Sequence, residues 1–164
     1  KSKPLIQHVI DAVAPLTSSI HIITSNAEYR QFDYPCFADE IQLKGPLAGI
    51  FTGLIHSSAK KNLLLGCDMP FLTTTLLEAL VRECGEEEVL LTEHQGKAEP
   101  LCSLYDLKCI PHIQKCLEEN QLKITDALRG LHTRVISFDK AGWFRGNEFT
   151  NMNTPGSLNA AETS

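Results

Sequence analysis

The apolar residues change their spacing several times along the chain, and each change predicts a different element. Between Pro4 and Leu16 they recur at helical spacing, and Pro4 suits a first helical turn because its missing N–H costs nothing there. Ile20 to Thr24 is short and rich in β-branched residues, which predicts a strand. Asn62 to Cys67 is a nearly continuous apolar run, which is typical of a strand buried on both faces.

The same patterns extend over the rest of the chain. Further helices are expected over 45–58, 73–84, 111–119, 126–131 and 154–161, and further strands over 36–38, 89–92, 101–105 and 135–138. Thr73 or Thr74 is the expected cap of the helix over 73–84, and Thr125 that of the helix over 126–131. Strands thus alternate with helices, which predicts an α/β fold with a mostly parallel sheet and helices on its faces. A loop over 93–97 is expected to join two strands as a hairpin, so the sheet is mixed.

Length, composition and charge narrow the class of protein. With 164 residues the chain suits a single domain over residues 1–164, and 43% hydrophobic and 21% charged residues are ordinary values for a globular protein. A formal net charge of −5 argues against binding to nucleic acid or to a membrane surface, which requires clustered positive charge. No apolar run reaches the ~18 residues of a membrane span. The first stretch also does not resemble a signal peptide, so a cytoplasmic protein is expected.

Sequence spacing also argues against several kinds of site. The six cysteines show no C-x-x-C spacing, and we interpret them as free thiols that pack as small hydrophobic groups in a reducing compartment. The six histidines lack zinc-binding spacing such as H-x-x-x-H, and neither a G-x-S-x-G elbow nor a P-loop is present. The acidic run from Gly85 to Glu88 is expected to be a solvated loop.

The strongest candidate for chemistry is an aspartate at the end of a strand, because ligands of open α/β sheets bind beyond the carboxyl ends of the strands. Asp68 follows the apolar run that ends at Cys67, and a carboxylate at that position is costly unless it is paired or bound to a metal. A single carboxylate with open coordination sites suits Mg²⁺, which keeps several waters and takes other ligands from substrate phosphates. A helix N-cap or a surface turn is the structural alternative for Asp68.

Four further polar residues and one helix start are weaker candidates. Asn26 and Asp39 follow the first two strands, although asparagine and aspartate are also ordinary turn residues. The segment Gly45 to Gly49 offers a helix N-terminus whose N–H groups can approach an anionic ligand. Asn151 and Asn153 share one face of an extended segment, although helix capping would also explain Asn153.

Three segments, taken in order along the chain, resemble a known family. They are Gly45-Pro46-Leu47-Ala48-Gly49-Ile50, Cys67-Asp68-Met69-Pro70-Phe71-Leu72 and Asn151-Met152-Asn153-Thr154-Pro155. With the segment Lys3 to His8, they resemble the molybdenum cofactor guanylyltransferases (MobA), nucleotidyltransferases with a three-layer α/β/α Rossmann-like fold. The C-D-M-P segment indicates only the wider superfamily, whereas the N-x-N-T-P segment favours the guanylyl branch over the cytidylyl relatives.

The resemblance implies a Mg²⁺-dependent enzyme that transfers GMP from GTP to the terminal phosphate of molybdopterin and releases pyrophosphate. It implies that Asp68 is the Mg²⁺ ligand and the main catalytic residue, and that Asn26 and Asp39, like Asp68, contact the nucleotide. Asn151 and Asn153 are then expected on the molybdopterin side. Proteins that insert molybdenum or act as chaperones of molybdoenzymes are the implied partners.

The sequence also departs from the family pattern. The family opens with a first strand, a glycine-rich L-A-G-G loop and basic residues that cradle the triphosphate, and the sequence starts after this segment of roughly 25–30 residues. The triphosphate ligands are therefore not assigned to residues of this chain. Two other functions stay open: a related nucleotidyltransferase with another nucleotide or acceptor, such as a cytidylyl or sugar-phosphate enzyme, and a non-catalytic module that binds a nucleotide or a pterin.

Overall fold

The computed structural model describes residues 3–41 and 44–152. The helices are α1 (Leu5–Val13), α2 (Gly45–Ile55), α3 (Thr74–Arg82), α4 (Ile110–Glu118) and α5 (Ile124–Ala127), with short 3₁₀ helices at Ala27–Phe32, Leu107–Cys109 and Leu128–Gly130. The strands are β1 (Ile22–Ile23), β2 (Cys36–Phe37), β3 (Lys61–Leu65), β4 (Val89–His94), β5 (Lys97–Asp106) and β6 (Thr133–Ser137). The helix expected over 154–161 and the candidate residue Asn153 lie outside the described residues.

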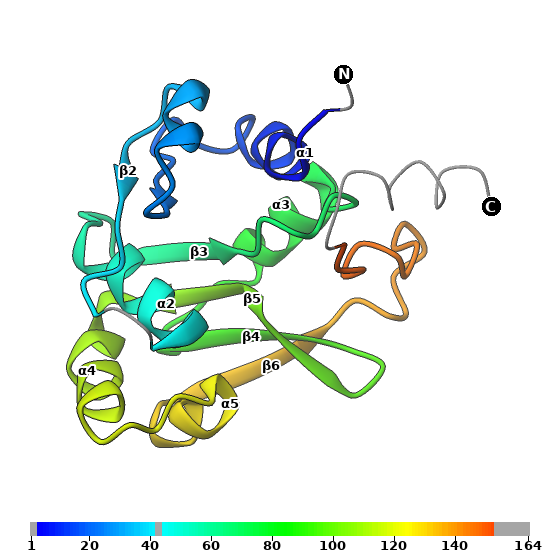
Figure 1. Cartoon of the computed structure of the whole chain (residues 1–164). Coiled ribbons are helices and arrows are strands. Elements are labelled where there is room, and N and C mark those ends of the chain that lie inside the picture. Colours follow the sequence, from blue (N-terminus) through cyan, green and yellow to red (C-terminus); the bar gives the residue numbers. More distant parts are fainter. Residues whose placement is uncertain (1–2, 42–43, 153–164) are drawn as a thin grey trace.

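Most of the strands belong to one mixed sheet of four strands in the order β3-β5-β4-β6 (Figure 1). Strand β4 is parallel to β6, and β5 is antiparallel to both β3 and β4, so β3, β4 and β6 run in the same direction. The short strands β1 and β2 form a separate parallel pair. The expected mixed, mostly parallel sheet is therefore confirmed.

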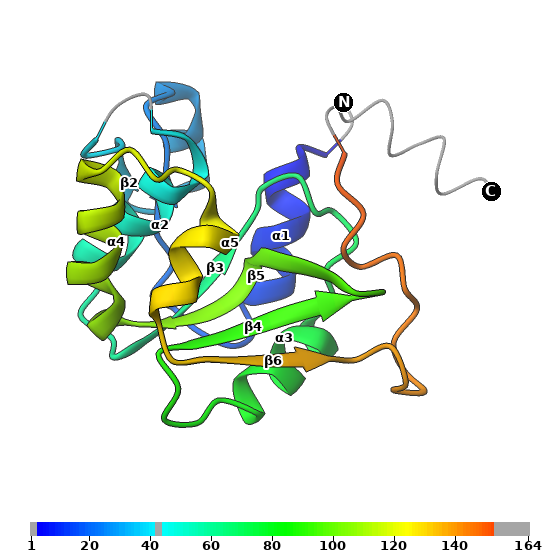
Figure 2. The same ribbon diagram turned by 90° about the horizontal axis from the view of Figure 1, so that it is seen from below.

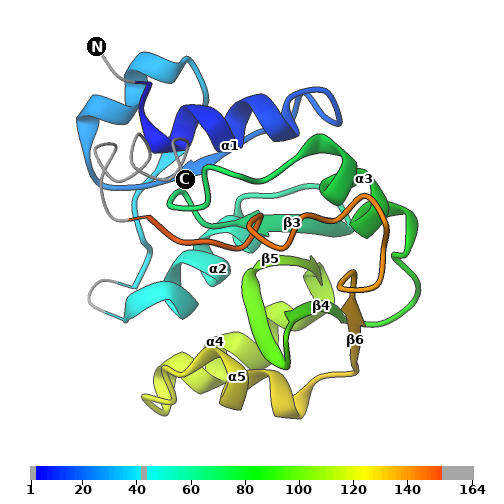
Figure 3. The ribbon, with the colours of Figure 1, turned by 90° about the vertical axis from the view of Figure 1, so that its right-hand side faces the viewer.

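Helices cover both faces of the four-stranded sheet because consecutive strand residues point to opposite sides. On β4, Val89 and Leu91 pack into a core with α2, α4 and α5, whereas Leu90 packs into a second core with α1 and α3. Figure 3 shows α1 and α3 on one side of the sheet and the other three helices on the opposite side. This is the three-layer α/β/α arrangement that the sequence resemblance implied.

Strand β3 differs from its prediction, because each of its residues is only half-buried. Its backbone pairs with β5 on one edge, and its other edge has no strand partner within the described part of the chain. Helix α2 crosses this edge: a Cβ at Gly53 would lie 3.2 Å from Leu64 of β3 and 3.8 Å from Ile23 of β1. Because it lacks a side chain, Gly53 lets α2 pack closely against both sheets. The run at β3 is apolar because its leucines contact neighbours on both faces of the sheet, and its residues are only half-buried because one edge of the strand has no strand partner among the described residues.

The hairpin between β4 and β5 is tighter than the expected loop over 93–97. The strands continue to His94 and restart at Lys97, and the two turn residues Gln95 and Gly96 have φ values of 49° and 77°. Two successive residues with positive φ are the signature of a type I′ turn, which matches the natural twist of antiparallel strands. As a result His94, Lys97 and Glu99 lie on one face of the hairpin, because His94 pairs with Lys97 and Glu99 follows two residues later.

Helix starts in the structure agree with one of the expected caps and not with another. The Thr73 side chain accepts a hydrogen bond of 3.2 Å from the N–H of Leu76, so Thr73 caps α3 as predicted. The predicted cap Thr125 is wrong, since it lies inside α5 and the N-cap residue of that helix is Lys123. The helix begins two residues earlier than its sequence pattern indicates, because Ile124 packs against the core on that side of the sheet.

The acidic run before β4 is only in part the solvated loop that we expected, because Gly85 and Glu86 are exposed whereas Glu87 is buried. Glu87 is 5% exposed, and its carboxylate accepts hydrogen bonds from the backbone N–H of Gly85 (3.0 Å) and from Arg134 (3.1 Å) on β6. Burial by itself would raise the pKa of Glu87, but these N–H donors and the arginine charge hold the pKa below its ordinary value. The run therefore ties the start of β4 to the edge strand.

A second buried carboxylate joins the end of β5 to the start of β3. Asp106 is 2% exposed, lies 3.3 Å from the ammonium of Lys61 and accepts a 2.9 Å hydrogen bond from the N–H of Lys108. Burial would raise the pKa of Asp106, but the Lys108 N–H and the Lys61 ammonium together lower it. The pair therefore favours the folded state whenever the carboxyl is ionised.

This pair predicts a pH-dependent loss of stability. Asp106→Asn should lower the free energy of unfolding at pH 7 by about 3 kcal/mol, because the half-buried Lys61 ammonium loses its counter-charge. Because the folded pKa is depressed, the wild-type advantage is present above the unfolded value of about 3.9 and disappears as the pH falls through the folded value. Urea unfolding at pH 7 and pH 3 measures both effects.

The control for this experiment is the exposed pair between Asp126 and Arg129. Asp126→Asn should change the unfolding free energy by less than about 1 kcal/mol at either pH. Equal stability of Asp106→Asn and the wild type at pH 7 would show that the buried pair contributes nothing.

Candidate functional site

The parallel strands bring their carboxyl ends to one edge of the sheet. Strand β3 leads to Asp68, β4 ends at His94 and β6 leads to Asp139. The tip of the β4–β5 hairpin lies at the same edge, and Figure 2 shows the segment after β6 returning along it. This is the edge at which α/β proteins bind their ligands.

Asp68 lies in the turn after β3, and its carboxylate makes no hydrogen bond or ion pair with any residue that the structure describes. The residue is half-buried, and only its backbone oxygen is engaged, accepting a 2.7 Å hydrogen bond from the N–H of Met152. Helix α3 is capped by Thr73, so Asp68 is not its N-cap. The carboxylate is therefore available to a ligand.

The backbone before Asp68 fixes where this carboxylate can lie. Gly66 is buried and donates its N–H to the oxygen of Leu101 at 2.8 Å, which continues the pairing of β3 with β5. A Cβ at position 66 would lie 2.8 Å from Oδ1 of Asp68. Any side chain at this position would therefore displace the carboxylate, and the glycine keeps the space that it occupies.

The candidate residue Asn151 lies beside Asp68. The Met152 N–H that bonds to Asp68 follows Asn151 directly, and the Asn151 side chain is exposed at this edge. Phe149, two residues earlier, is buried in the core that α1 and α3 cover. The segment over 149–152 is thus held at both ends, and it places Asn151 next to the Asp68 turn.

Asn26 and Asp39 follow the separate strands β1 and β2, and neither shares a hydrogen bond or an ion pair with Asp68 in the described residues. The Asn26 side chain accepts a 2.9 Å hydrogen bond from the N–H of Glu28 and caps the 3₁₀ helix at Ala27–Phe32, as the turn interpretation allows. Asp39 differs from it, because Oδ1 of Asp39 is buried against α2 near Gly49 without a hydrogen-bond partner among the described residues. Asp39 therefore has unused capacity to accept a hydrogen bond.

The first N–H groups of α2 receive no side-chain cap from the N-cap residue Lys44. The helix begins at Gly45, whose φ of 64° is the left-handed value that favours glycine, and Pro46 follows in the first turn as expected. Lys44 precedes the helix without a side-chain capping bond, and its ammonium instead donates to Asn120 at 2.6 Å. The N–H groups at the start of α2 can therefore still attract an anionic ligand, as the sequence indicated.

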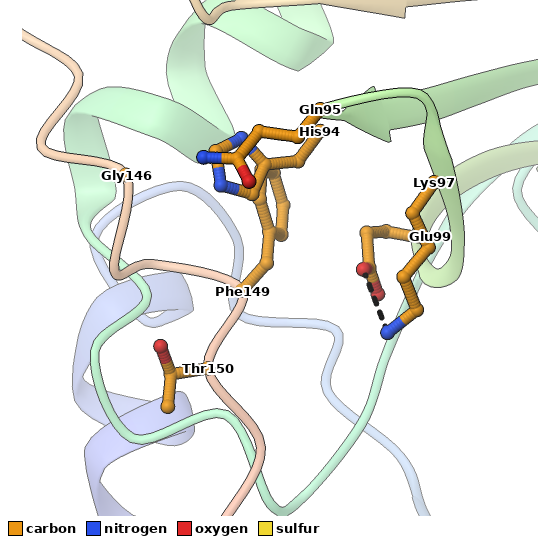
Figure 4. Close-up of a pocket in the computed structure, with 7 residues that line it drawn as sticks. All are labelled: His94, Gln95, Lys97, Glu99, Gly146, Phe149 and Thr150. Atoms are coloured by element: carbon orange, nitrogen blue, oxygen red, sulfur yellow. Dashed lines mark ion pairs between the residues drawn. The ribbon is translucent and has the colours of Figure 1, made fainter.

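A pocket of about 340 Å³ lies between the hairpin and the segment after β6. Figure 4 shows the residues that line it: His94, Gln95, Lys97, Glu99, Gly146, Phe149 and Thr150. None of these seven residues was among the sequence candidates. The hairpin residues were missed because the two strands were expected over 89–92 and 101–105, which leaves out His94, Lys97 and Glu99. Extending the period-two alternation across a Gln-Gly turn would have placed His94, Lys97 and Glu99 on one face.

The wall of this pocket is held by His94 and Asp139. Nδ1 of His94 lies 2.6 Å from Oδ1 of Asp139, and the other carboxylate oxygen accepts a 2.8 Å hydrogen bond from the N–H of Gln95. These two contacts lower the pKa of Asp139, the His94 bond contributing most. The His94 ring also packs against Phe144 and Phe149, with centroids 5.3 Å and 5.6 Å away. The arrangement positions the imidazole ring as a rigid wall.

The residues at this edge fit a metal that keeps most of its coordination for water and substrate. Within residues 3–41 and 44–152, no cluster of three or more histidine, cysteine or acidic side chains could enclose a metal ion. Asp68 offers one carboxylate without an internal partner, which suits Mg²⁺ because this ion is commonly bound by one or two carboxylates together with substrate phosphates.

Comparison with known proteins shows to which family the chain belongs. A model of the MobA-like NTP transferase domain matches residues 1–134, which is most of the chain. The chain belongs to the MobA-like NTP transferase family. The protein is therefore a nucleotidyltransferase, and the matched range includes the helix start at α2, the Asp68 turn and the hairpin.

Curated relatives extend the similarity to nearly the whole chain. The probable molybdenum cofactor guanylyltransferase of Flavobacterium johnsoniae is 35% identical over 158 residues, which cover 96% of this chain and 82% of that protein. The molybdenum cofactor guanylyltransferase of Vibrio vulnificus is 34% identical over 163 residues, with 96% and 80% of the two chains covered. Both similarities include the segment after β6 that the family model leaves unmatched.

Solved structures agree on the fold. The molybdopterin-guanine dinucleotide biosynthesis protein A from Archaeoglobus fulgidus superposes with a TM-score of 0.76 at 23% identity and covers 97% of this chain and 84% of its own. A protein from Aquifex aeolicus gives a TM-score of 0.81 at 19% identity, with 92% and 79% covered. In the part of the MobA-like chain that the structure describes, no helix is both long and apolar enough to cross a membrane.

The close approach of Gly66 to Asp68 generates a prediction. Gly66→Ala should lower nucleotidyltransferase turnover by about 10- to 100-fold, because the new methyl group forces the Asp68 carboxylate out of position. The melting temperature should change little, since the side chain that moves is the free end of Asp68. Pyrophosphate release by the full-length protein measures the turnover.

Gly142→Ala is the matched control for this variant. A Cβ at Gly142 meets nothing within 4 Å, so this substitution should leave turnover unchanged. If Gly66→Ala turned over as fast as Gly142→Ala, the position of the Asp68 carboxylate would not matter for the reaction.

Proposed function

We propose that this MobA-like protein is a Mg²⁺-dependent molybdenum cofactor guanylyltransferase that transfers GMP from GTP to the terminal phosphate of molybdopterin and releases pyrophosphate. The names of the curated relatives support the reaction. The observation that carries the proposal is the Asp68 carboxylate, which lies at the ligand-binding edge beside the segment of Asn151 and has no partner among the residues that the structure describes.

The proposed chemistry requires alignment and neutralised charge more than proton transfer. The acceptor phosphate is already an anion, so in-line attack on the α-phosphate of GTP needs no strong general base. Bound Mg²⁺ would supply Lewis-acid polarisation of the α-phosphate and charge for the pyrophosphate leaving group. Asp68 would hold the ion, and Asn151 would orient the acceptor from the neighbouring segment.

The nucleotide is proposed to bind on the side of β1, β2 and α2. Asp39 supports this assignment because its buried Oδ1 has no partner in the described residues, and a buried acceptor without a donor is costly unless a ligand supplies one. The uncapped start of α2 adds N–H groups that favour an anionic group. Asn26 would act through its capped turn, since its side-chain oxygen is already engaged.

The cradle for the triphosphate is proposed to come from the glycine-rich loop and first strand that the family resemblance describes. The support is the edge of β3 that has no strand partner among the described residues, together with α2, where a Cβ at Gly53 would lie 3.2 Å from Leu64 of β3 and 3.8 Å from Ile23 of β1. A strand added there would complete one sheet over both halves and would make residues 1–164 part of a single nucleotidyltransferase domain.

The proposed reaction also suggests where and with whom the protein works. All six cysteines are free, which fits a reducing compartment such as the cytoplasm. Because molybdopterin is both the acceptor and part of the product, proteins that insert molybdenum or serve as chaperones of molybdoenzymes are the proposed partners.

Removal of the Asp68 charge tests the metal assignment. Asp68→Asn should reduce formation of the guanine dinucleotide from GTP, Mg²⁺ and molybdopterin by about 1000-fold, because the group that neutralises the reacting phosphates is no longer held. The melting temperature should stay close to that of the wild type, since the carboxylate has no internal partner. Glu78→Gln on the exposed side of α3 is the control and should keep full activity. Wild-type turnover of Asp68→Asn would place the metal elsewhere.

Nucleotide choice distinguishes the proposal from its alternative, a cytidylyl or sugar-phosphate enzyme. GTP with Mg²⁺ at about 100 times its Kd should raise the melting temperature of the full-length protein by about 5–10 °C, because binding to the folded state adds about 2.7 kcal/mol. CTP, ATP and UTP should give smaller shifts, and Asp39→Asn should reduce the GTP shift. A larger shift with CTP would favour the cytidylyl alternative.

A further inference from the structure

The pocket beside the hairpin contains a largely buried carboxylate with few donors around it. Glu99 is 6% exposed, although it lies on β5 only three residues from the hairpin turn at Gln95 and Gly96. Its carboxylate has one charged partner in the described residues, the ammonium of Lys97 at 3.5 Å, and Figure 4 shows this contact at the edge of the pocket. Both residues line the pocket, so the carboxylate faces a space that a ligand can fill.

The ion pair with Lys97 does not account for the burial of Glu99. The Lys97 side chain is 74% exposed, and a long, solvated side chain at 3.5 Å contributes little to stability. An ionised carboxylate can accept about four hydrogen bonds, and a buried one is costly when these are missing. The structural carboxylate Asp106 shows the contrast, because a backbone N–H and a half-buried ammonium both bond to it. Glu99 therefore keeps acceptor capacity that the N–H donors of a ligand can use.

The opposite side of the pocket is aromatic and fixed in place. His94 is held by Asp139 at 2.6 Å, and Phe149 packs against the His94 ring from the returning segment. Thr150 adds a hydroxyl group next to Phe149. In Figure 4, Phe149 and Thr150 lie across the space from Glu99 and Lys97. A flat heterocycle would find an aromatic wall on one side and a buried acceptor of N–H groups on the other.

The pocket lies within reach of the Asp68 turn. Thr150 lines the pocket, and Met152 bonds to the backbone oxygen of Asp68, so these two residues of the returning segment lie at most about 7 Å apart along the chain. A ligand with a flat ring at one end and a phosphate at the other would place its ring at Glu99 and its phosphate near Asp68. Under the proposed function the acceptor has this shape, since molybdopterin carries a pterin ring and a terminal phosphate.

We propose that Glu99 is the specificity-determining residue for the acceptor and that it binds the amino-bearing edge of the pterin ring in this pocket. The ring N–H and the adjacent exocyclic amine of a pterin are two neighbouring donors, which match the two oxygens of one carboxylate. His94 and Phe149 form the wall against which the ring lies. This inference rests on the proposed function, because molybdopterin is taken as the acceptor.

The decisive variant is Glu99→Gln, which keeps the shape of the side chain and replaces one acceptor oxygen with a donor. In steady-state assays with full-length protein, GTP and Mg²⁺, the KM for molybdopterin should rise by about 10- to 100-fold, as expected for a lost charged hydrogen bond. The kcat at saturating molybdopterin and the KM for GTP should stay within about twofold of the wild type. An unchanged KM for molybdopterin would overturn the proposal.

Lys97→Met separates the role of Glu99 from that of its ion pair, because it removes the ammonium while leaving the Glu99 carboxylate in place. Its KM for molybdopterin should rise clearly less than that of Glu99→Gln, as expected for loss of an exposed pair. The matched control outside the pocket is Lys60→Met, which removes an exposed pair with Glu86 and should leave the KM for molybdopterin unchanged. If Lys97→Met raised the KM as much as Glu99→Gln, Glu99 would act only by holding the lysine, and the specificity role would be wrong.

A second variant, Glu99→Asp, tests whether a raised KM only reflects damage to the fold. Glu99→Asp keeps the charge but withdraws the carboxylate by one methylene, so the KM for molybdopterin should rise while the melting temperature and the GTP-induced thermal shift stay those of the wild type. A raised KM accompanied by loss of the GTP shift would mean general damage to the site and would count against the proposal.

The proposed function and the role of Glu99 predict different failures. If the wild-type protein forms no guanine dinucleotide from GTP and molybdopterin, the proposed function is wrong. If the wild type is active and Glu99→Gln binds molybdopterin equally well, the proposed function stands and the role of Glu99 is wrong.

Discussion

The hydrogen bond from the N–H of Met152 to the oxygen of Asp68 is the contact on which the arrangement of the site depends. It joins the turn after β3 to a segment from the far end of the described chain. On the β3 side, the Gly66 N–H fixes the turn to β5, and on the other side Phe149 is buried in the core. Because both ends are anchored, one 2.7 Å bond sets the position of Asp68 relative to Asn151 and to the pocket at the hairpin.

The acidic residues of the chain differ in how far their surroundings satisfy them. Glu87 and Asp106 each bond to a backbone N–H and to a cationic side chain, and the pKa of each is lowered although burial opposes this. Their role is to join strands. Asp68 and Glu99, which lie at the ligand-binding edge, lack such sets of donors. Since an ionised group without donors is expensive in a protein interior, the missing donors indicate where ligands contribute.

One buried carboxylate shows the limit of this reasoning. Glu148 is 1% exposed and accepts a 2.9 Å hydrogen bond from the N–H of Arg145, but its second oxygen has no partner in the described residues. The engaged oxygen closes the turn that returns the chain towards Phe149. A free acceptor atom is therefore not enough to assign a ligand site. At Glu99 the further observations are its ion pair with an exposed lysine, the pocket that it lines and the short chain link from that pocket to Asp68.

The sequence was most informative where function and local structure depend on nearby residues. The place of Asp68 beyond a strand end could be predicted because an apolar strand runs into it, and the cap Thr73 because capping needs only an N–H three residues later. The half-burial of β3 could not be predicted, since it depends on which strand lies at its second edge. The burial of Glu87 could also not be predicted, because its partner Arg134 lies on a different strand.

The pocket residues were missed for a more specific reason. A Gln-Gly turn is short enough that the polar residues on either side of it continue the strands. Polar residues beside a glycine also fit a loop, however, and residues assigned to a loop were not assigned to a face of the sheet. Once the two positive φ values are known, register alone places His94 opposite Lys97. The partner of His94, Asp139, follows a different strand and is found only when β4 and β6 are known to be parallel neighbours.

The position of β3 fits the proposed role of Asp68, in which one carboxylate serves two substrates. On one side of β3 lie α2, β1 and β2 with Asp39, and on the other lie the hairpin and the returning segment. An in-line transfer needs the attacking and leaving groups on opposite sides of the reacting phosphorus, so a strand end between two binding regions is the natural place for the charge that both share. The Asp68 turn is anchored to β5 and to Met152, so contacts with the elements that line the hairpin pocket set its position relative to that pocket.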